Sequence, residues 1–222
     1  MIRIKQNYKS STRIDGAVDS KTFVENFVLH GTALSTLDTL GKEVRNTSQR
    51  CFTLTGTYGT GKSTFALFMS LLLSGCKKDR DFAQKKLLAA DPSSSFINEL
   101  GLKKGWRIVK HVCGLDSPAE GLANSILQAL ENSSAPANKS DHDYIDLIDT
   151  SLSNAAKSDD GVLILLDEMG KALDYQSREN KDLHFFQELA DTIEKSNTQV
   201  VLVGFLHQSF AEYARSMTSH IQ

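Results

Sequence analysis

The fold is decided by one stretch of the chain, Cys51-Phe52-Thr53-Leu54-Thr55-Gly56-Thr57-Tyr58-Gly59-Thr60-Gly61-Lys62-Ser63-Thr64. It begins with an apolar run, contains the pattern G-x-x-x-x-G-K-S, and continues into a second apolar run from Phe65 to Leu73. This order predicts a buried strand, a tight loop and a helix. Glycines at positions 56, 59 and 61 allow positive φ angles and let backbone N–H groups come close to an anion. The sequence therefore predicts a loop that binds the phosphates of a nucleotide.

The residue types at the end of this loop have separate roles. Lys62 can reach the β- and γ-phosphates, and the Ser63 hydroxyl can ligate Mg²⁺. The helix that begins near Gly61 adds its unpaired N–H groups and the positive end of its dipole. A plain glycine turn between a strand and a helix would not need Lys and Ser at these positions. The predicted nucleotide-binding residues are Gly56, Thr57, Tyr58, Gly59, Thr60, Gly61, Lys62, Ser63 and Thr64.

Length and composition indicate one globular domain. The chain has 222 residues, of which 40% are hydrophobic and 23% are charged, and its formal net charge is −2. These values give no general electrostatic reason to expect binding to nucleic acid or to an anionic membrane. The N-terminus has no signal-peptide core and no apolar run is long enough to cross a bilayer, so the expected location is the cytoplasm. Residues 1–20 are predicted to form a flexible arm, and residues 21–222 one domain.

Two groups of side chains are expected to be structural. Cys51, Cys76 and Cys113 lie in or beside apolar segments without CxxC spacing, which predicts buried, reduced thiols. The run from Lys77 to Asp81 mixes basic with acidic residues, which favours a solvated helix face over a nucleic-acid-binding patch.

Further strands alternate with helices after the loop. Trp106 to Cys113, Val162 to Leu166 and Val200 to Val203 are apolar runs, and the segments between them carry helical periodicity. A run such as 162–166 is typical of a strand buried on both faces of a parallel sheet. The pattern predicts an α/β fold with right-handed crossovers.

An acidic pair follows the third of these strands. Asp167 and Glu168 come directly after Leu166, at the carboxyl end of the strand, where open α/β sheets bind ligands. Asp167 can organise Mg²⁺ at the phosphates, and Glu168 can act as general base towards water. A strand that ends in two solvated acids is common, but the upstream phosphate loop favours the catalytic interpretation.

The order of these motifs over about residues 20–215 resembles an AAA+/ORC-like or STAND-like ATPase module, within the P-loop NTPases that carry a catalytic glutamate on a strand. The stretches 166–171 and 203–210 are similar to those of large bacterial ATPases, some of which accompany phage-defence systems. The resemblance implies a three-layer αβα core with a mainly parallel sheet, ATP as substrate and Mg²⁺ as cofactor. Residues 153–159 contain no LSGGQ-like signature, which disfavours an ABC- or SMC-type head, and the sequence after Asp167-Glu168 disfavours a DEAD- or DExH-type helicase.

The same resemblance implies a sensor of the γ-phosphate after the strand 200–203. AAA-type proteins usually place Asn or Thr there, whereas this chain offers His207 and Gln208, and a lone His after a strand is more often structural. Arg178 and Arg215 are candidates for an arginine finger supplied to a neighbouring subunit. Lys171 can contact phosphate or a partner, although a solvated lysine is the commoner case.

Two functional hypotheses follow. The first is Mg²⁺-dependent ATP hydrolysis that drives conformational change in a larger protein or homo-oligomer, in bacterial defence or a DNA-related process. The alternative is a nucleotide-gated interaction switch with little turnover. The fifth strand and helical lid of the family are expected to lie outside these residues, so that the chain is a shortened version or a fragment of a longer protein, and turnover is expected to depend on those parts. DNA, RNA, a protein and a toxic effector domain all stay open as the target.

Overall fold

Four parallel strands form the sheet in the computed structural model, which describes residues 13–101, 103–156, 161–178, 184–195, 199–209 and Tyr213. The strands are β1 (Cys51–Thr55), β2 (Arg107–Val112), β3 (Val162–Asp167) and β4 (Val200–Leu206), and their order in the sheet is β1-β4-β3-β2. The prediction of an α/β fold with a parallel sheet is confirmed. Because β4 lies between β1 and β3, the residues that follow these three strands lie near one another at the carboxyl edge of the sheet.

The two central strands are the most buried part of the sheet. Every residue of β3 and every residue of β4 is buried. Their nearly continuous apolar sequences match this position, because a parallel strand in the centre of such a sheet contacts helices on both faces. The edge strand β1, in contrast, has no fully buried residue.

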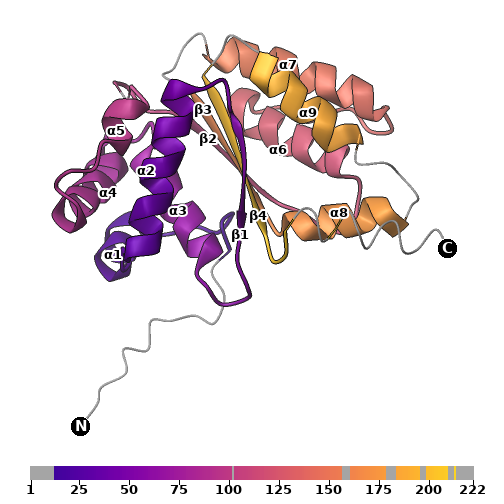
Figure 1. Cartoon of the computed structure of the whole chain (residues 1–222). Helices are drawn as coiled ribbons and strands as arrows, with labels where there is room; N and C mark the ends of the chain where they lie inside the picture. Colours follow the sequence, from indigo (N-terminus) through magenta and orange to yellow (C-terminus); the bar gives the residue numbers. More distant parts are fainter. Residues whose placement is uncertain are drawn as a thin grey trace.

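One face of the sheet is covered by α1 (Ser20–Asn26), α2 (Gly31–Asn46), α3 (Lys62–Leu72), α4 (Lys77–Ala90) and the short α5 (Phe96–Glu99). Figure 1 shows these helices together on one side of the sheet. Leu67 and Phe68 of α3 belong to the same buried cluster as Leu165 of β3 and Val203 of β4. The helix after the glycine loop is therefore anchored directly on the central strands.

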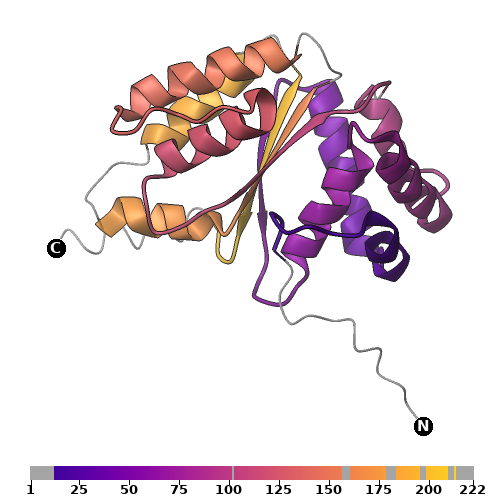
Figure 2. The same cartoon turned by 180° about the vertical axis from the view of Figure 1, so that it is seen from behind.

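The other face is covered by α6 (Pro118–Glu131), α7 (Asp141–Ala156), α8 (Met169–Arg178) and α9 (His184–Lys195), as the reverse view in Figure 2 shows. Ile126, Ile148 and Phe185 pack there with Ile164 and Leu202 of the sheet. The helix α6 begins with Ser117 as its N-cap and Pro118 in its first turn, residue types that favour a helix start at these positions. Helices on both faces of a parallel sheet are compatible with a three-layer αβα fold.

Three residues lie in environments that the sequence did not predict. Ile14, within the stretch predicted to be a flexible arm, is fully buried in the core cluster of α1–α5. Arg80 was predicted to lie on a solvated face but is only 8% exposed, because its guanidinium donates to the carbonyls of Ser74 and Lys104. Of the three thiols predicted to be buried, Cys113 is buried and Cys51 is half-buried, whereas Cys76 is exposed at the start of α4.

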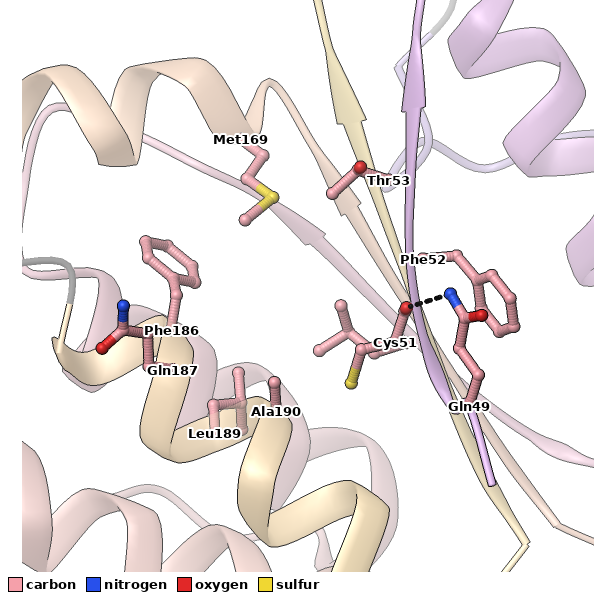
Figure 3. A pocket seen from close by; sticks show the side chains of 10 residues that line it. Gln49, Cys51, Phe52, Thr53, Met169, Phe186, Gln187, Leu189 and Ala190 are labelled. Atoms are coloured by element: carbon pink, nitrogen blue, oxygen red, sulfur yellow. Dashed lines mark hydrogen bonds between the residues drawn. The ribbon is translucent and has the colours of Figure 1, made fainter. Parts of the chain in front are cut away.

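A mainly apolar cavity of about 410 Å³ opens between β1 and α9 (Figure 3). Its lining includes Cys51, Thr53, Met169, Phe186 and Leu189. Burial raises the pKa of the Cys51 thiol to about 12, with a smaller contribution from Glu194, so this thiol is protonated at neutral pH. The cavity borders the first three residues of β1, at the opposite end of the strand from the glycine loop.

Within the described ranges, no helix combines the length and the apolar character that spanning a membrane requires.

Candidate functional site

The loop between β1 and α3 uses its glycines in two ways. Gly59 and Gly61 have φ angles of +79° and +86°, a region in which a side chain would be strained. At Gly56 the reason is space, because a Cβ there would lie 2.9 Å from the Thr60 hydroxyl oxygen. That hydroxyl donates to the Thr57 carbonyl at 2.8 Å. The loop backbone is thus tightly folded, and its residues 57–61 are exposed.

The helix α3 starts at Lys62 without a capping side chain. Its N-cap is Gly61, and no side-chain oxygen accepts a hydrogen bond from the first turn. The first N–H groups of a helix have no partner inside the helix, and they carry the positive end of its dipole. Ser63 and Thr64 are half-buried in this first turn. This end of α3 is therefore able to accept an anion.

Lys62 folds back onto the loop from which it extends. Its Nζ donates to the Gly56 carbonyl at 2.5 Å and to the Thr57 carbonyl at 2.9 Å, and it lies 3.1 Å from His207 Nδ1. Burial lowers the pKa of the Lys62 amine, whereas the negative charges of Asp167 and Glu168 act in the opposite direction. All three protons of the Lys62 ammonium have acceptors, and the carboxylates of Asp167 and Glu168 lie close enough to affect its pKa.

Asp167 and Glu168, the acidic pair at the end of β3, contact different neighbours. Asp167, the last residue of β3, is 5% exposed, and its Oδ1 accepts the Glu168 N–H at 3.0 Å. Glu168 adopts a left-handed backbone conformation, with φ of +57°. Its Oε2 lies 3.3 Å from His207 Nε2 and 3.6 Å from Lys171 Nζ. Lys171 is exposed, which is the commoner expectation for it, and its ammonium also pairs with the Glu168 carboxylate.

Two glycines let the turn around Glu168 pack closely. A Cβ at Gly204 of β4 would collide with the Met169 sulfur, and a Cβ at Gly170 would collide with the Tyr213 hydroxyl. Met169 and Gly170 begin α8 immediately after Glu168. The close packing on both sides fixes the turn that carries the carboxylate.

His207 joins the two halves of the site. It follows β4, and its imidazole lies between Lys62 on one nitrogen and Glu168 on the other. The Tyr58 ring stacks on this imidazole with ring centroids 3.6 Å apart and planes inclined by 23°. An ammonium can only donate, so Nδ1 accepts from Lys62, and Nε2 carries the proton that is donated to Glu168. The segments that follow β1, β4 and β3 thus meet in one chain of hydrogen bonds, from Lys62 through His207 to Glu168.

No protein-family model matches this chain, and no curated protein matches it.

The remaining predicted residues lie further from this chain of contacts or outside the described residues. Gln208 is exposed next to His207, and Arg178 is exposed at the end of α8. Arg215 lies outside the described residues. The residue that the sequence missed is Tyr58, which was predicted only as part of the loop and not through its side chain. An aromatic residue in a small-residue loop was the signal that could have revealed it.

Ser63 and Asp167 were predicted to hold a magnesium ion. Among the described residues, no group of three or more His, Cys, Asp or Glu side chains could hold a metal ion alone. One hydroxyl and one carboxylate nevertheless fit Mg²⁺, which usually keeps several waters and takes few protein oxygens together with substrate phosphates. The donor set suits a metal that arrives with its substrate.

Proposed function

We propose that this chain is a Mg²⁺-dependent ATPase module whose turnover drives conformational change in a larger protein or assembly. The observation that carries the proposal is the contact of Lys62, His207 and Glu168. These residues lie in the segments that follow three neighbouring strands, with Lys62 at the start of α3 after the loop that follows β1. Lys62 is a cation that can pair with phosphate, and Glu168 is a carboxylate that can take a proton from water. The imidazole of His207 contacts both of them. The uncapped start of α3 adds the N–H groups that a polyphosphate needs.

Each residue has one task in this proposal. The loop from Gly56 to Thr64 holds the phosphates, and Lys62 moves from the carbonyls of its own loop to the β- and γ-oxygens. Ser63 and Asp167 would hold Mg²⁺, which would supply positive charge to neutralise the phosphates. Glu168 accepts a proton from the attacking water, and His207 with Gln208 senses the γ-phosphate. The resemblance of the sequence to bacterial ATPases suggests defence or a DNA-related process as the setting.

A second candidate function is a nucleotide-gated switch. It is favoured by the fact that Lys62 and Glu168 are already engaged with His207, so that a bound nucleotide must rearrange the site. In this case occupancy by ATP or ADP controls assembly, and turnover is incidental. A comparison of oligomer size with ATP, ADP and no nucleotide distinguishes the two, because only the switch predicts strong nucleotide-dependent assembly with slow hydrolysis.

The ATPase proposal is tested by Glu168→Gln. Loss of a general base lowers a rate by about 10²- to 10⁴-fold, while the similar shape of Gln preserves binding. We expect single-turnover phosphate release to fall by this factor and the Kd for ATP to change by less than about threefold, which is under 1 kcal/mol.

The matched control is Glu188→Gln, which makes the same substitution at another glutamate that pairs with a histidine. It should leave phosphate release unchanged. Equal rates for Glu168→Gln and the unmodified chain would show that Glu168 is not the base.

A further inference from the structure

Tyr58 is an unusual side chain for its position. It is 76% exposed, in a loop otherwise made of glycine and threonine before Lys62, yet its ring lies flat against an imidazole that is itself only 16% exposed. An exposed aromatic ring gains little from burial at this site. The contact with His207 is therefore the feature that distinguishes this residue from an arbitrary loop residue.

Hydrogen bonds alone leave the His207 ring incompletely fixed. The contacts at Nδ1 and Nε2 set the direction of the line between the two nitrogens. They do not set the tilt of the ring about that line. A second ring stacked on one face fixes the tilt, because offset-stacked rings hold their planes nearly parallel.

Tyr58 also lies beside the other end of the hydrogen-bond chain. Lys62 Nζ is 5.9 Å from the centre of the Tyr58 ring, within the range of a cation–π contact. The same aromatic ring therefore borders both the ammonium and the imidazole that accepts from it. The loop that binds phosphate in the proposed function thus also carries the group that orients His207.

We propose that Tyr58 is a positioning residue, which acts through His207 and keeps its imidazole aligned between Lys62 and Glu168. This inference rests on the proposed function, because the alignment of His207 affects a reaction only if Glu168 takes part in ATP hydrolysis. When Lys62 turns to a bound triphosphate, His207 loses its donor at Nδ1, and the stacked ring keeps Nε2 directed at Glu168. The imidazole therefore stays aligned with the carboxylate that accepts the proton from water while substrate occupies the loop.

The first test needs no nucleotide and no activity. Nitrogen-15 NMR of the nucleotide-free chain, above the usual histidine pKa of about 6.5, reports which imidazole nitrogen carries the proton. The spectrum of His207→Asn identifies the His207 signals among the six histidines. We expect the tautomer protonated at Nε2 in all three chains, because Lys62 donates to Nδ1 in each. Carbon-13 relaxation of the imidazole should show a rigid His207 ring in the unmodified chain and in Tyr58→Phe, and a more mobile ring in Tyr58→Ala. Equal mobility of the His207 ring in the three chains would overturn the proposal.

The second test is a double-mutant cycle on single-turnover hydrolysis. Misplacement of a group by about 1 Å can cost about 100-fold in rate, so we expect Tyr58→Ala to lower the rate by about tenfold or more with little change in the Kd for ATP. Tyr58→Phe should recover most of this loss, because it keeps the ring. In the His207→Ala background, Tyr58→Ala should have less than about a twofold further effect, since residues that act as a unit are not additive.

An equal loss in both backgrounds, or a weaker Kd with an unchanged rate, would contradict the role through His207. If the unmodified chain neither binds nor hydrolyses ATP, the proposed function fails, and the NMR comparison still decides whether Tyr58 orients His207.

Discussion

Two histidine–carboxylate pairs in this chain differ in what surrounds them. His142 Nδ1 and Glu188 Oε1 are 2.6 Å apart on α7 and α9, whereas His207 Nε2 and Glu168 Oε2 are 3.3 Å apart at the edge of the sheet. The side chain of His142 is 71% exposed, and that of His207 is 16% exposed. His184 also lies 3.5 Å from Glu188, so the helix pair contains two imidazoles around one carboxylate. The imidazole of the shorter contact is thus the more exposed one, whereas the two carboxylate side chains are about equally exposed.

The distance between a histidine and a carboxylate therefore does not by itself show how tightly the histidine is held. An exposed ion pair is weakened by water and salt and contributes about 0–1 kcal/mol at most sites. His207 instead has both nitrogens engaged and one face covered, and it links residues that are more than a hundred positions apart in the sequence. The His207 side chain at the glycine loop is held by contacts with Lys62, Glu168 and Tyr58, and this set of contacts distinguishes it from His142 more than the length of one bond does.

The largest effect on nucleotide affinity is expected from Lys62→Ala, which removes the ammonium from the glycine loop. Hydrogen bonds to charged groups contribute about 1.5–3 kcal/mol each, so ATP binding should weaken by about 10- to 100-fold or more. His142→Ala removes a charged group from the other pair and should leave the Kd unchanged. Isothermal titration calorimetry with both variants measures this contrast. Equal affinities for Lys62→Ala and the unmodified chain would place the nucleotide elsewhere.

A smaller effect is expected on turnover from His207→Ala. Removal of the link between Lys62 and Glu168 should lower the single-turnover rate by about tenfold, the lower end of what positioned side chains contribute. His184→Ala, which removes an imidazole beside Glu188, should leave the rate within about twofold of the original. If both variants lose the same factor, general destabilisation and not the site is responsible, which melting curves of the two variants would show.

The smallest effect concerns the pH dependence of stability. The hydrogen bond to Glu188, with Asp146 adding its charge, raises the pKa of His142. A raised pKa in the folded state stabilises the fold below the unfolded pKa of about 6.5, and this contribution disappears as the pH rises through the folded value. His142→Ala should therefore lower the melting temperature slightly near pH 5.5 and not near pH 9. A larger loss at the higher pH would contradict the assignment.

Much of the fold could be predicted because its signals are local. The run Val162 to Leu166 predicts a strand buried on both faces, and β3 is buried throughout. The Ser117-Pro118 start of α6 is likewise readable from its neighbours. The burial of Arg80 could not be predicted, because its acceptors at Ser74 and Lys104 meet only after the segments around α4 pack together.

The site follows the same division. The glycine loop and the acidic pair are visible as contiguous motifs, and the order of the strands explains why His207 comes to lie between them. An aromatic residue in a loop of small residues marks Tyr58 as unusual, but its stacking partner could not be predicted, because His207 lies 149 positions away in the sequence. Long-range contacts between single side chains leave no periodic pattern in the sequence.

The central claim is tested most directly by single-turnover phosphate release from ATP, measured with Mg²⁺ and again with a chelator in its place. We expect release in the presence of Mg²⁺ and a fall to the level of Glu168→Gln when the metal is removed, because in the proposed function Ser63 and Asp167 would hold it at the phosphates. Tight ATP binding without any Mg²⁺-dependent release would contradict the ATPase proposal and favour the nucleotide-gated switch.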